Sequence, residues 1–303
     1  MSKKISELLP YPEDPRTFVP GARLTSNYLY GVEIELERVA SRPPLRYWVW
    51  HDDNSLRDNG AEISFQVPLG GIDVERALDE FKQMVELLTK KQKHPPISSE
   101  RCGVHVHIDF RPCTVEQVVS FFVGFCIFEA ALFTIGGKHR YSSIYCPGVS
   151  SCTPLIKSIN KLYTAGSDHA VVTFMEQWSK YTGVNLRSLV ERGSIEVRMH
   201  EGTIDSEDIM LWLLLLDKLK QYTDSVSPEE LVNTAKYQGI TFASTVFGDL
   251  SSHLMTDNYI NFYKNNLRNA FDCVYMHKIY ALTRPASSDI KLISEAIIRA
   301  LES

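Results

Sequence analysis

The sequence predicts a mixed fold, α/β or α+β, in which a sheet packs against helices. Several stretches alternate polar and apolar residues, which is typical of half-buried strands, and others repeat apolar residues at helical spacing. Of the 303 residues, 44% are hydrophobic and 23% charged, which is sufficient for a large core. No stretch has the length and composition of a flexible linker, so we expect residues 1–303 to form a single domain.

The boundaries of the expected elements follow from these patterns. An extended lead-in that contains several prolines precedes the first strand. The predicted strands are residues 29–38, 47–51, 61–67, 103–110 and 194–199. The predicted helices are residues 72–91, 118–135, a short helix within 138–165, 170–181, 207–222, and several short helices from 227 to a last one at 290–301. For the apolar helix 118–135, Thr114 and Gln117 are the expected N-terminal cap, and Gly136 and Gly137 are expected to end it. The main motifs lie in residues 29–205, and 206–303 is expected to be mainly helical.

The apolar stretch 118–135 has about the minimum length of a membrane span. It carries Glu129 in its interior and Thr134 near its end, and no second such stretch follows. We therefore interpret it as a buried core helix and expect no membrane association. The first residues lack an apolar run and a small-residue cleavage site, so no signal peptide is predicted.

Charge and cysteine content narrow the classes of function. The formal net charge is −5 and the isoelectric point is near 6.0, which gives no strong nucleic-acid signal over the whole surface. The six cysteines include no Cys-x-x-Cys pair, so the sequence indicates neither a zinc ribbon nor a disulfide framework. A reducing, cytoplasmic location is expected.

Four of the predicted strands concentrate ionisable side chains on one face. Residues two apart on a strand share a face. The four polar sets are Glu33, Glu35 and Glu37; Glu62, Ser64 and Gln66; His105, His107 and Asp109; and Glu196, Arg198 and His200. A water-facing surface would explain such alternation in any single strand, but these four sets favour Glu and His. Closely spaced carboxylates repel one another unless cations lie among them, so the pattern predicts a face that binds two or more metal ions.

Three connecting segments place further polar residues beside these strands. Residues 52–57, which include Asp53, form either a polar turn or part of a site before the strand of Glu62. Residues 138–140 follow a Gly-Gly pair at a helix end, where they either compensate the helix dipole or bind phosphate. Gly202 directly follows the last strand, and a glycine there permits a ligand to approach the backbone.

These motifs together resemble the amidoligase family, a branch of the fold shared by glutamine synthetase and glutamate–cysteine ligase. The matching stretches, in the family's order, are residues 31–37, 53–56, 60–62, 103–107, 140–145, 181–185 and 194–205. The last stretch is the most specific. The resemblance implies an α+β fold whose curved, mainly antiparallel sheet has a polar concave face and helices packed behind it, like the catalytic domain of glutamine synthetase. Residues 206–303 match none of the motifs beyond their helices.

The resemblance also implies roles for individual residues. ATP and two or three Mg²⁺ (or Mn²⁺) ions would lie in the concave face. The implied metal ligands are Glu33, Glu35, Glu62, Glu196 and one imidazole, His105 by preference, with His107 on the same face as the alternative. The implied contacts with nucleotide or substrate are His107, Arg140 and Asn185, and Arg198 would contact a phosphate or an acyl phosphate. Glu37 and Asp53 are candidates for the group that takes the proton from the amine.

The reaction implied by the resemblance joins a carboxylic acid to an amine through an acyl phosphate, with ATP as the phosphoryl donor. The substrates are expected to be small-molecule or peptide carboxylates and amines, and a homo-oligomer is possible. No counterpart of the loops with which glutamine synthetase binds ammonia and glutamate is recognised, so the acid need not be glutamate. Three alternatives stay open: a guanidine kinase-like phosphotransferase, a metal-dependent hydrolase that uses the His and Glu cluster, and a binding module without catalytic activity.

Overall fold

The computed structural model describes residues 3–9, 18–91, 95–137, 139–140, 143 and 146–283. In this part of the chain six strands form one open sheet of order β2-β3-β1-β4-β6-β5, in which all neighbours run antiparallel. The strands are β1 (Tyr30–Leu36), β2 (Trp48–Asp52), β3 (Ala61–Phe65), β4 (Gly103–Asp109), β5 (Val184–Asn185) and β6 (Ser194–Glu201). The mixed fold with a mainly antiparallel sheet is thus confirmed, whereas the closer likeness to glutamine synthetase stays a prediction.

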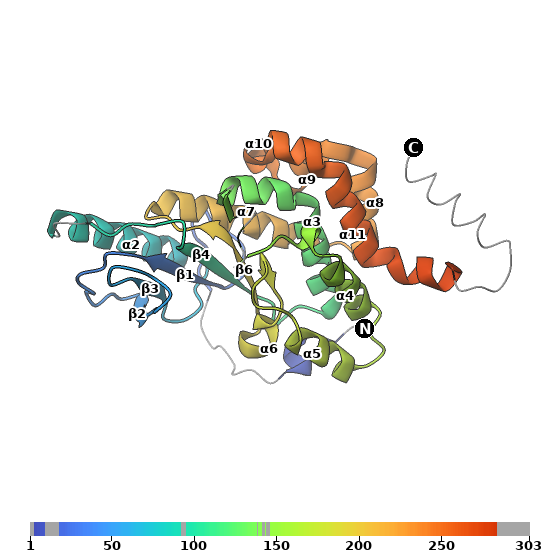
Figure 1. Ribbon diagram of the computed structural model, residues 1–303, viewed down its shortest axis with the longest axis horizontal. Coiled ribbons are helices and arrows are strands. Elements are labelled where there is room, and N and C mark those ends of the chain that lie inside the picture. Colours follow the sequence, from blue (N-terminus) through green and yellow to red (C-terminus); the bar gives the residue numbers. More distant parts are fainter. Residues whose placement is uncertain are drawn as a thin grey trace.

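Helices account for most of the remaining described residues. They are α1 (Ile5–Leu8), α2 (Ile72–Lys91), α3 (Val115–Gly136), α4 (Thr153–Tyr163), α5 (Asp168–Glu176), α6 (Ser188–Arg192), α7 (Ser206–Asp224), α8 (Pro228–Gln238), α9 (Phe242–Phe247), α10 (Ser251–Leu254) and α11 (Asp257–Thr283), with short 3₁₀ helices at Val149–Ser151, Gly239–Thr241 and Gly248–Leu250. Figure 1 shows α2 and α7 along one side of the strands β1–β4, and α3, α4 and α8–α11 gathered on the far side of β6.

One face of the sheet packs against these helices. The side chains of Val32, Ile34 and Leu36 alternate along β1 and are fully buried. On the same side, the indole of Trp48 donates a hydrogen bond to the carbonyl of Ala77 in α2 (2.8 Å). Because neighbouring residues of a strand point to opposite faces, the carboxylates of β1 lie on the face that α2 and α7 leave open.

The apolar helix α3 lies in the core of the protein. Thr114 and Gln117 form the predicted capping box, and Gly137 follows the helix with a φ of 116°. Among the described residues, α3 is the one helix long and apolar enough to span a membrane, but 89% of its most apolar stretch is buried against the rest of the chain. Its one internal carboxylate, Glu129, accepts hydrogen bonds from the backbone N–H groups of Val149 (2.5 Å) and Ser150 (2.9 Å). The interpretation of this stretch as a core helix is therefore confirmed.

A β-bulge in β6 overturns one prediction about the polar face. Val106 pairs with Val197, but Val104 pairs with His200, so two residues of β6 lie opposite one residue of β4. The extra residue moves His200 to the helix-covered side. There its ring packs 5.1 Å from that of Trp212 in α7, and only 1% of the residue is exposed. The expectation that His200 shares a face with Glu196 and Arg198 is wrong, because alternation holds only while pairing stays regular.

Three further element predictions need correction. The two-residue strand β5 is too short to give a sequence pattern and was not predicted. The helix expected at 170–181 ends at Glu176, where the chain turns and the indole of Trp178 donates to the carbonyl of Val184 (3.0 Å). The C-terminal part contains short helices, as expected, but also the 27-residue α11. The helix predicted at 290–301, Lys138 and residues 1–2 and 10–17 of the proline-rich lead-in lie outside the described residues.

Candidate functional site

Antiparallel pairing brings the polar residues of four strands together on the open face. Glu33 of β1 pairs with His105 of β4, and Glu35 pairs with Glu62 of β3. On the other side of β4, His107 pairs with Glu196 of β6. Directly opposed side chains on one face have Cβ atoms only about 5 Å apart. The register therefore assembles the predicted site from residues more than 150 positions apart in the sequence.

A first group of potential metal ligands consists of Glu33, His105 and Glu196. One ligand atom of each lies within 4.8 Å of those of the other two. The Nδ1 atom of His105 is 3.5 Å from Glu33 Oε2 and 3.8 Å from Glu196 Oε1, and it has no hydrogen-bond partner although the residue is only 3% exposed. An unpartnered buried nitrogen is costly, so this atom is suited to a ligand held between the two carboxylates.

A second group lies next to the first and consists of Glu35, Asp53 and Glu62. Their ligand oxygens also lie within 4.8 Å of one another. The loop after β2 contributes Asp53, whose Oδ1 accepts a hydrogen bond from the N–H of Ser55 (2.8 Å). The N–H of Gly103 donates to Glu35 Oε2 (2.6 Å) and fixes that carboxylate. Glu33 and Glu35 lie two residues apart on β1 and share its open face. That strand therefore joins the two groups into one site.

The charges of this site are not neutralised evenly. Burial alone would raise the pKa of Glu33, but its close approach to the imidazoles of His105 and His107 holds that pKa well below its usual range. By contrast, burial, together with the negative charges of Glu33, Glu35 and Asp53, raises the pKa of Glu62 to about 7. The second group therefore carries more negative charge than its surroundings stabilise.

The surroundings of the two histidines differ, which the alternation along β4 does not reveal. His107 Nδ1 lies within hydrogen-bonding distance of the hydroxyls of Ser188 (3.2 Å) and Ser194 (3.1 Å). Its Nε2 lies 3.2 Å from Glu33 Oε1. His107 is thus held by partners on both sides, whereas His105 Nδ1 has none. The structure favours His105 as the ligand of the first group.

Two predicted arginines border the paired groups. Arg140 donates from Nη2 to the carbonyl of Arg198 (2.9 Å), and Arg198 forms an ion pair with Glu196. In each guanidinium the buried Nε has no hydrogen-bond partner. A Cβ added at Gly103 would lie 2.9 Å from Arg140 Nη2 and 3.0 Å from His105 Nε2. This glycine therefore lets the arginine and the imidazole approach the same point above β4.

Two other predicted residues take positions that support the site. Asn185 of β5 donates to Glu196 Oε2 (2.7 Å), so it orients a carboxylate. Glu37 is buried and accepts a hydrogen bond from the backbone N–H of Arg57 (3.0 Å), which fastens the loop that carries Asp53. Among the described residues, neither of the two potential metal-binding groups includes Glu37.

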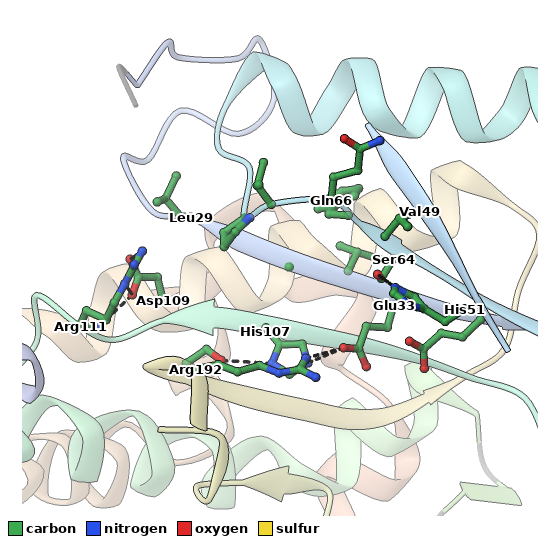
Figure 2. Close-up of a pocket in the computed structure, with 17 residues that line it drawn as sticks. Leu29, Glu33, Val49, His51, Ser64, Gln66, His107, Asp109, Arg111 and Arg192 are labelled. Carbon is green, nitrogen blue, oxygen red and sulfur yellow. Dashed lines mark hydrogen bonds and ion pairs between the residues drawn. The ribbon is translucent and has the colours of Figure 1, made fainter. Parts of the chain in front are cut away.

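Arg192, the last residue of α6, was not among the predicted site residues. Its Nη1 donates to Glu33 Oε1 (2.6 Å) and lies 3.2 Å from His107 Nε2. Figure 2 shows Arg192, His107 and Glu33 along one side of a pocket, with His51 and Ser64 at one end and the Asp109–Arg111 pair at the other. The short helix α6 has no periodic pattern, and only its position before the strand of Glu196 could have drawn attention to it.

The donor set fits divalent cations. Five carboxylates and one imidazole form two adjoining groups, and such oxygen-rich sets suit Mg²⁺, or Mn²⁺ where an imidazole joins. Two observations support this fit: the unpartnered Nδ1 of His105 in the first group and the raised pKa of Glu62 in the second. Both are expected where a bound cation would supply the missing partner and the missing positive charge.

Comparison with known protein families agrees with this geometry. Residues 71–220 match the model of a family described as "putative amidoligase enzyme". The chain belongs to the amidoligase family, and the family's description indicates an enzyme of the ligase type. The matched segment includes His105, Arg140, Asn185, Glu196 and Arg198, and it begins after the strands that carry Glu33, Glu35 and Glu62. No curated protein matches the chain.

Proposed function

We propose that this protein is an ATP- and Mg²⁺-dependent ligase that joins a carboxylic acid to an amine. The observation that carries the proposal is the pair of adjoining carboxylate groups on the open face, with the unpartnered Nδ1 of His105 between Glu33 and Glu196. Enzymes that transfer phosphoryl groups need several cations and arginines around the phosphates, because positioning and charge stabilisation supply most of the catalysis. Membership of the amidoligase family supports the choice of an amide as the product.

In this proposal Glu33, His105 and Glu196 hold one cation, and Glu35, Asp53 and Glu62 hold another. Bound cations would neutralise phosphate charge and polarise the transferred phosphoryl group. Asp53, predicted as a proton acceptor, is better placed here as a ligand because its oxygen lies within the second group. Glu37 stays a candidate for the proton acceptor, although its carboxylate already binds the N–H of Arg57.

The remaining residues act on the substrates. The substrate carboxylate attacks the γ-phosphate of ATP, giving an acyl phosphate and ADP, and the amine then displaces phosphate from the acyl carbon. Arg198 and Arg140 present positive charge beside the paired groups and stabilise phosphoryl oxygens. Asn185 keeps Glu196 oriented. A cytoplasmic location and a small-molecule or peptide substrate are proposed together with this activity.

Product analysis with a single variant tests the proposal. Wild type should convert ATP to ADP over many turnovers only when both an acid and an amine are present, and mass spectrometry should detect the amide. Glu196→Gln preserves shape but removes a charge that both Arg198 and the first group use, so ADP release should fall by about two to three orders of magnitude. Glu191→Gln, on the exposed end of α6, is the control and should retain activity. Full activity in Glu196→Gln would remove the central claim.

The hydrolase alternative has less support in the geometry. A hydrolase that used the His-x-His-x-Asp stretch of β4 would require His105, His107 and Asp109 to converge on one metal. Asp109 instead binds Arg111 through both carboxylate oxygens, at 2.8 and 3.0 Å, and His107 is held by two serines. A guanidine kinase-like phosphotransferase would also make ADP but no amide, so the same product analysis distinguishes it from the ligase.

A further inference from the structure

A pocket of about 540 Å³ adjoins the two carboxylate groups, and the proposed binding of cations by these groups gives the pocket no role. It shares Glu33, Glu62 and His107 with the site, and its size lies in the usual range for ligand pockets, roughly 300–1,000 Å³. Part of its wall is apolar, formed by Leu29, Val49, Val67 and Pro68. Val49 and Val67 are 38% and 48% exposed, which leaves apolar surface available to a ligand.

The strongest anion-binding group in this pocket is Arg192. Its side chain is 58% exposed, yet Nη1 lies 2.6 Å from Glu33 Oε1. Among the described residues, the hydrogen bonds of this guanidinium involve Nη1 only, through Glu33 and His107. A guanidinium presents five N–H donors in a fork that matches a carboxylate, so most of this capacity is left for a ligand.

The partner of Arg192 is also a residue of the first potential metal-binding group. Glu33 Oε2 faces His105, and Glu33 Oε1 faces Arg192 and His107. The guanidinium of this ion pair is 58% exposed, so water competes for it, whereas a divalent cation held among several carboxylate oxygens attracts Glu33 more strongly. Cation binding at Glu33 therefore weakens the hold on Arg192 and leaves its guanidinium facing the pocket.

We propose that this pocket binds the acid substrate, with Arg192 as the anchor for its carboxylate. Glu33 holds the guanidinium of Arg192 until a metal cation replaces that guanidinium at Glu33. The acid therefore binds after the metal cation. The apolar wall selects an acid with an apolar body over a short polar one. This inference rests on the proposed ligase function and deepens it by naming the acid's class and its anchor.

The first experiment measures Mn²⁺ binding by electron paramagnetic resonance, without nucleotide or acid. Arg192→Ala should bind Mn²⁺ about threefold to tenfold more tightly than wild type. The reason is that the guanidinium, which competes with Mn²⁺ for the carboxylate of Glu33, has been removed. The matched control is Arg187→Ala, directly before the same short helix, whose side chain pairs with exposed Glu191 and lies outside both groups. That control should keep the wild-type affinity for Mn²⁺.

The second experiment measures binding of 4-phenylbutyrate by calorimetry, with and without Mg²⁺ and without an amine. Wild type should bind this acid more tightly with Mg²⁺, and more tightly than it binds glutamate. Arg192→Ala should lose about tenfold in affinity for the acid although its Mn²⁺ affinity rises. Val67→Asn should weaken acid binding and keep Mn²⁺ binding, because it makes the apolar wall polar without adding a charge.

The outcomes separate this inference from the proposed function. Opposite changes in Mn²⁺ and acid affinity in Arg192→Ala support the anchor, since a merely structural residue would weaken both. Unchanged or weaker Mn²⁺ binding in that variant, or unchanged acid binding, overturns the inference alone. Equal binding of glutamate and 4-phenylbutyrate overturns the assigned class of acid. Wild type that binds no Mn²⁺ overturns both the inference and the metal centre on which it rests.

Discussion

On the helix-covered side of the sheet, the ammonium of Lys220 is fully buried and lies 2.8 Å from both carboxylate oxygens of Asp224. It also donates to Cys113 Sγ (3.0 Å), and Tyr28 donates its hydroxyl hydrogen to the same aspartate (2.7 Å). On the open face, the carboxylates of two adjoining groups outnumber the nearby cations, and the Nδ1 of His105 has no partner.

The comparison distinguishes two uses of buried charge. A buried ion pair with complete partners contributes to the fold, and removing either member leaves an uncompensated charge. A buried group with unmatched charge costs stability in the free protein, and this cost is recovered when a ligand of opposite charge binds. The open face of this sheet carries such unmatched buried charge, which is why we assign the site there and not at Lys220.

The largest expected effect is on the helix side. Lys220→Met should lower the free energy of unfolding by about 3 kcal/mol, because it leaves the mostly buried carboxylate of Asp224 without its countercharge. Urea denaturation measures this loss. The double variant Lys220→Met/Asp224→Leu removes both charges and should recover much of it. A loss below about 1 kcal/mol would show that this pair is not a structural element of the fold.

The two imidazoles on opposite faces provide a second test. His105→Gln should weaken Mn²⁺ binding about tenfold or more, because it removes a ligand of the first group. His200→Gln should leave Mn²⁺ affinity unchanged, because the bulge in β6 places that ring against Trp212. Titration followed by electron paramagnetic resonance compares the two. Equal losses in both variants would contradict the assignment of the faces.

A smaller effect is expected at Glu62, with the opposite sign to that at Lys220. Because its pKa is raised from 4.5 to about 7, the folded, metal-free protein holds this proton more tightly than the unfolded chain does. Its contribution to stability is therefore complete below pH 4.5 and is lost as the pH rises through 7. At pH 8, Glu62→Gln should stabilise the metal-free protein, on the order of 1 kcal/mol.

The same residue predicts the pH dependence of cation binding. A cation must displace the proton of Glu62 below about pH 7, so wild type should bind Mg²⁺ more tightly as the pH rises from 6 to 8. Thermal unfolding with and without Mg²⁺ at each pH measures this trend. In Glu62→Gln the trend should flatten. A pH-independent response in wild type would show that Glu62 does not face the cation.

The sequence placed most of the clustered polar residues on one face of the sheet, because alternation is a local property of strands. Glu33, Glu35 and His105 could be placed on one face without knowing their partners. The error at His200 arose from a bulge, which depends on how β6 pairs with β4 and leaves no mark in β6 itself. Arg192 was missed for a similar reason, because its contact with Glu33 joins residues 159 positions apart.

The choice between His105 and His107 shows the same limit. Both histidines lie on the same face of β4, and only the serines that approach from α6 and β6 distinguish their environments. Sequence pattern thus identified which residues share a face, whereas the role of each depended on neighbours supplied by other elements. The same applies to Asn185, whose partner Glu196 lies on the adjacent strand.

The most direct test of the account is thermal stability with Mg²⁺ and ATP, added separately and together, for wild type and Glu196→Gln. A ligand that binds only the folded state raises stability by about 2.7 kcal/mol at a hundred times its dissociation constant. The account predicts that Mg²⁺ alone stabilises wild type and that ATP adds a further rise only when Mg²⁺ is present. This further rise should be absent in the variant. No response to ATP, together with stabilisation by Zn²⁺ or Mn²⁺ alone, would contradict the ligase and favour the hydrolase.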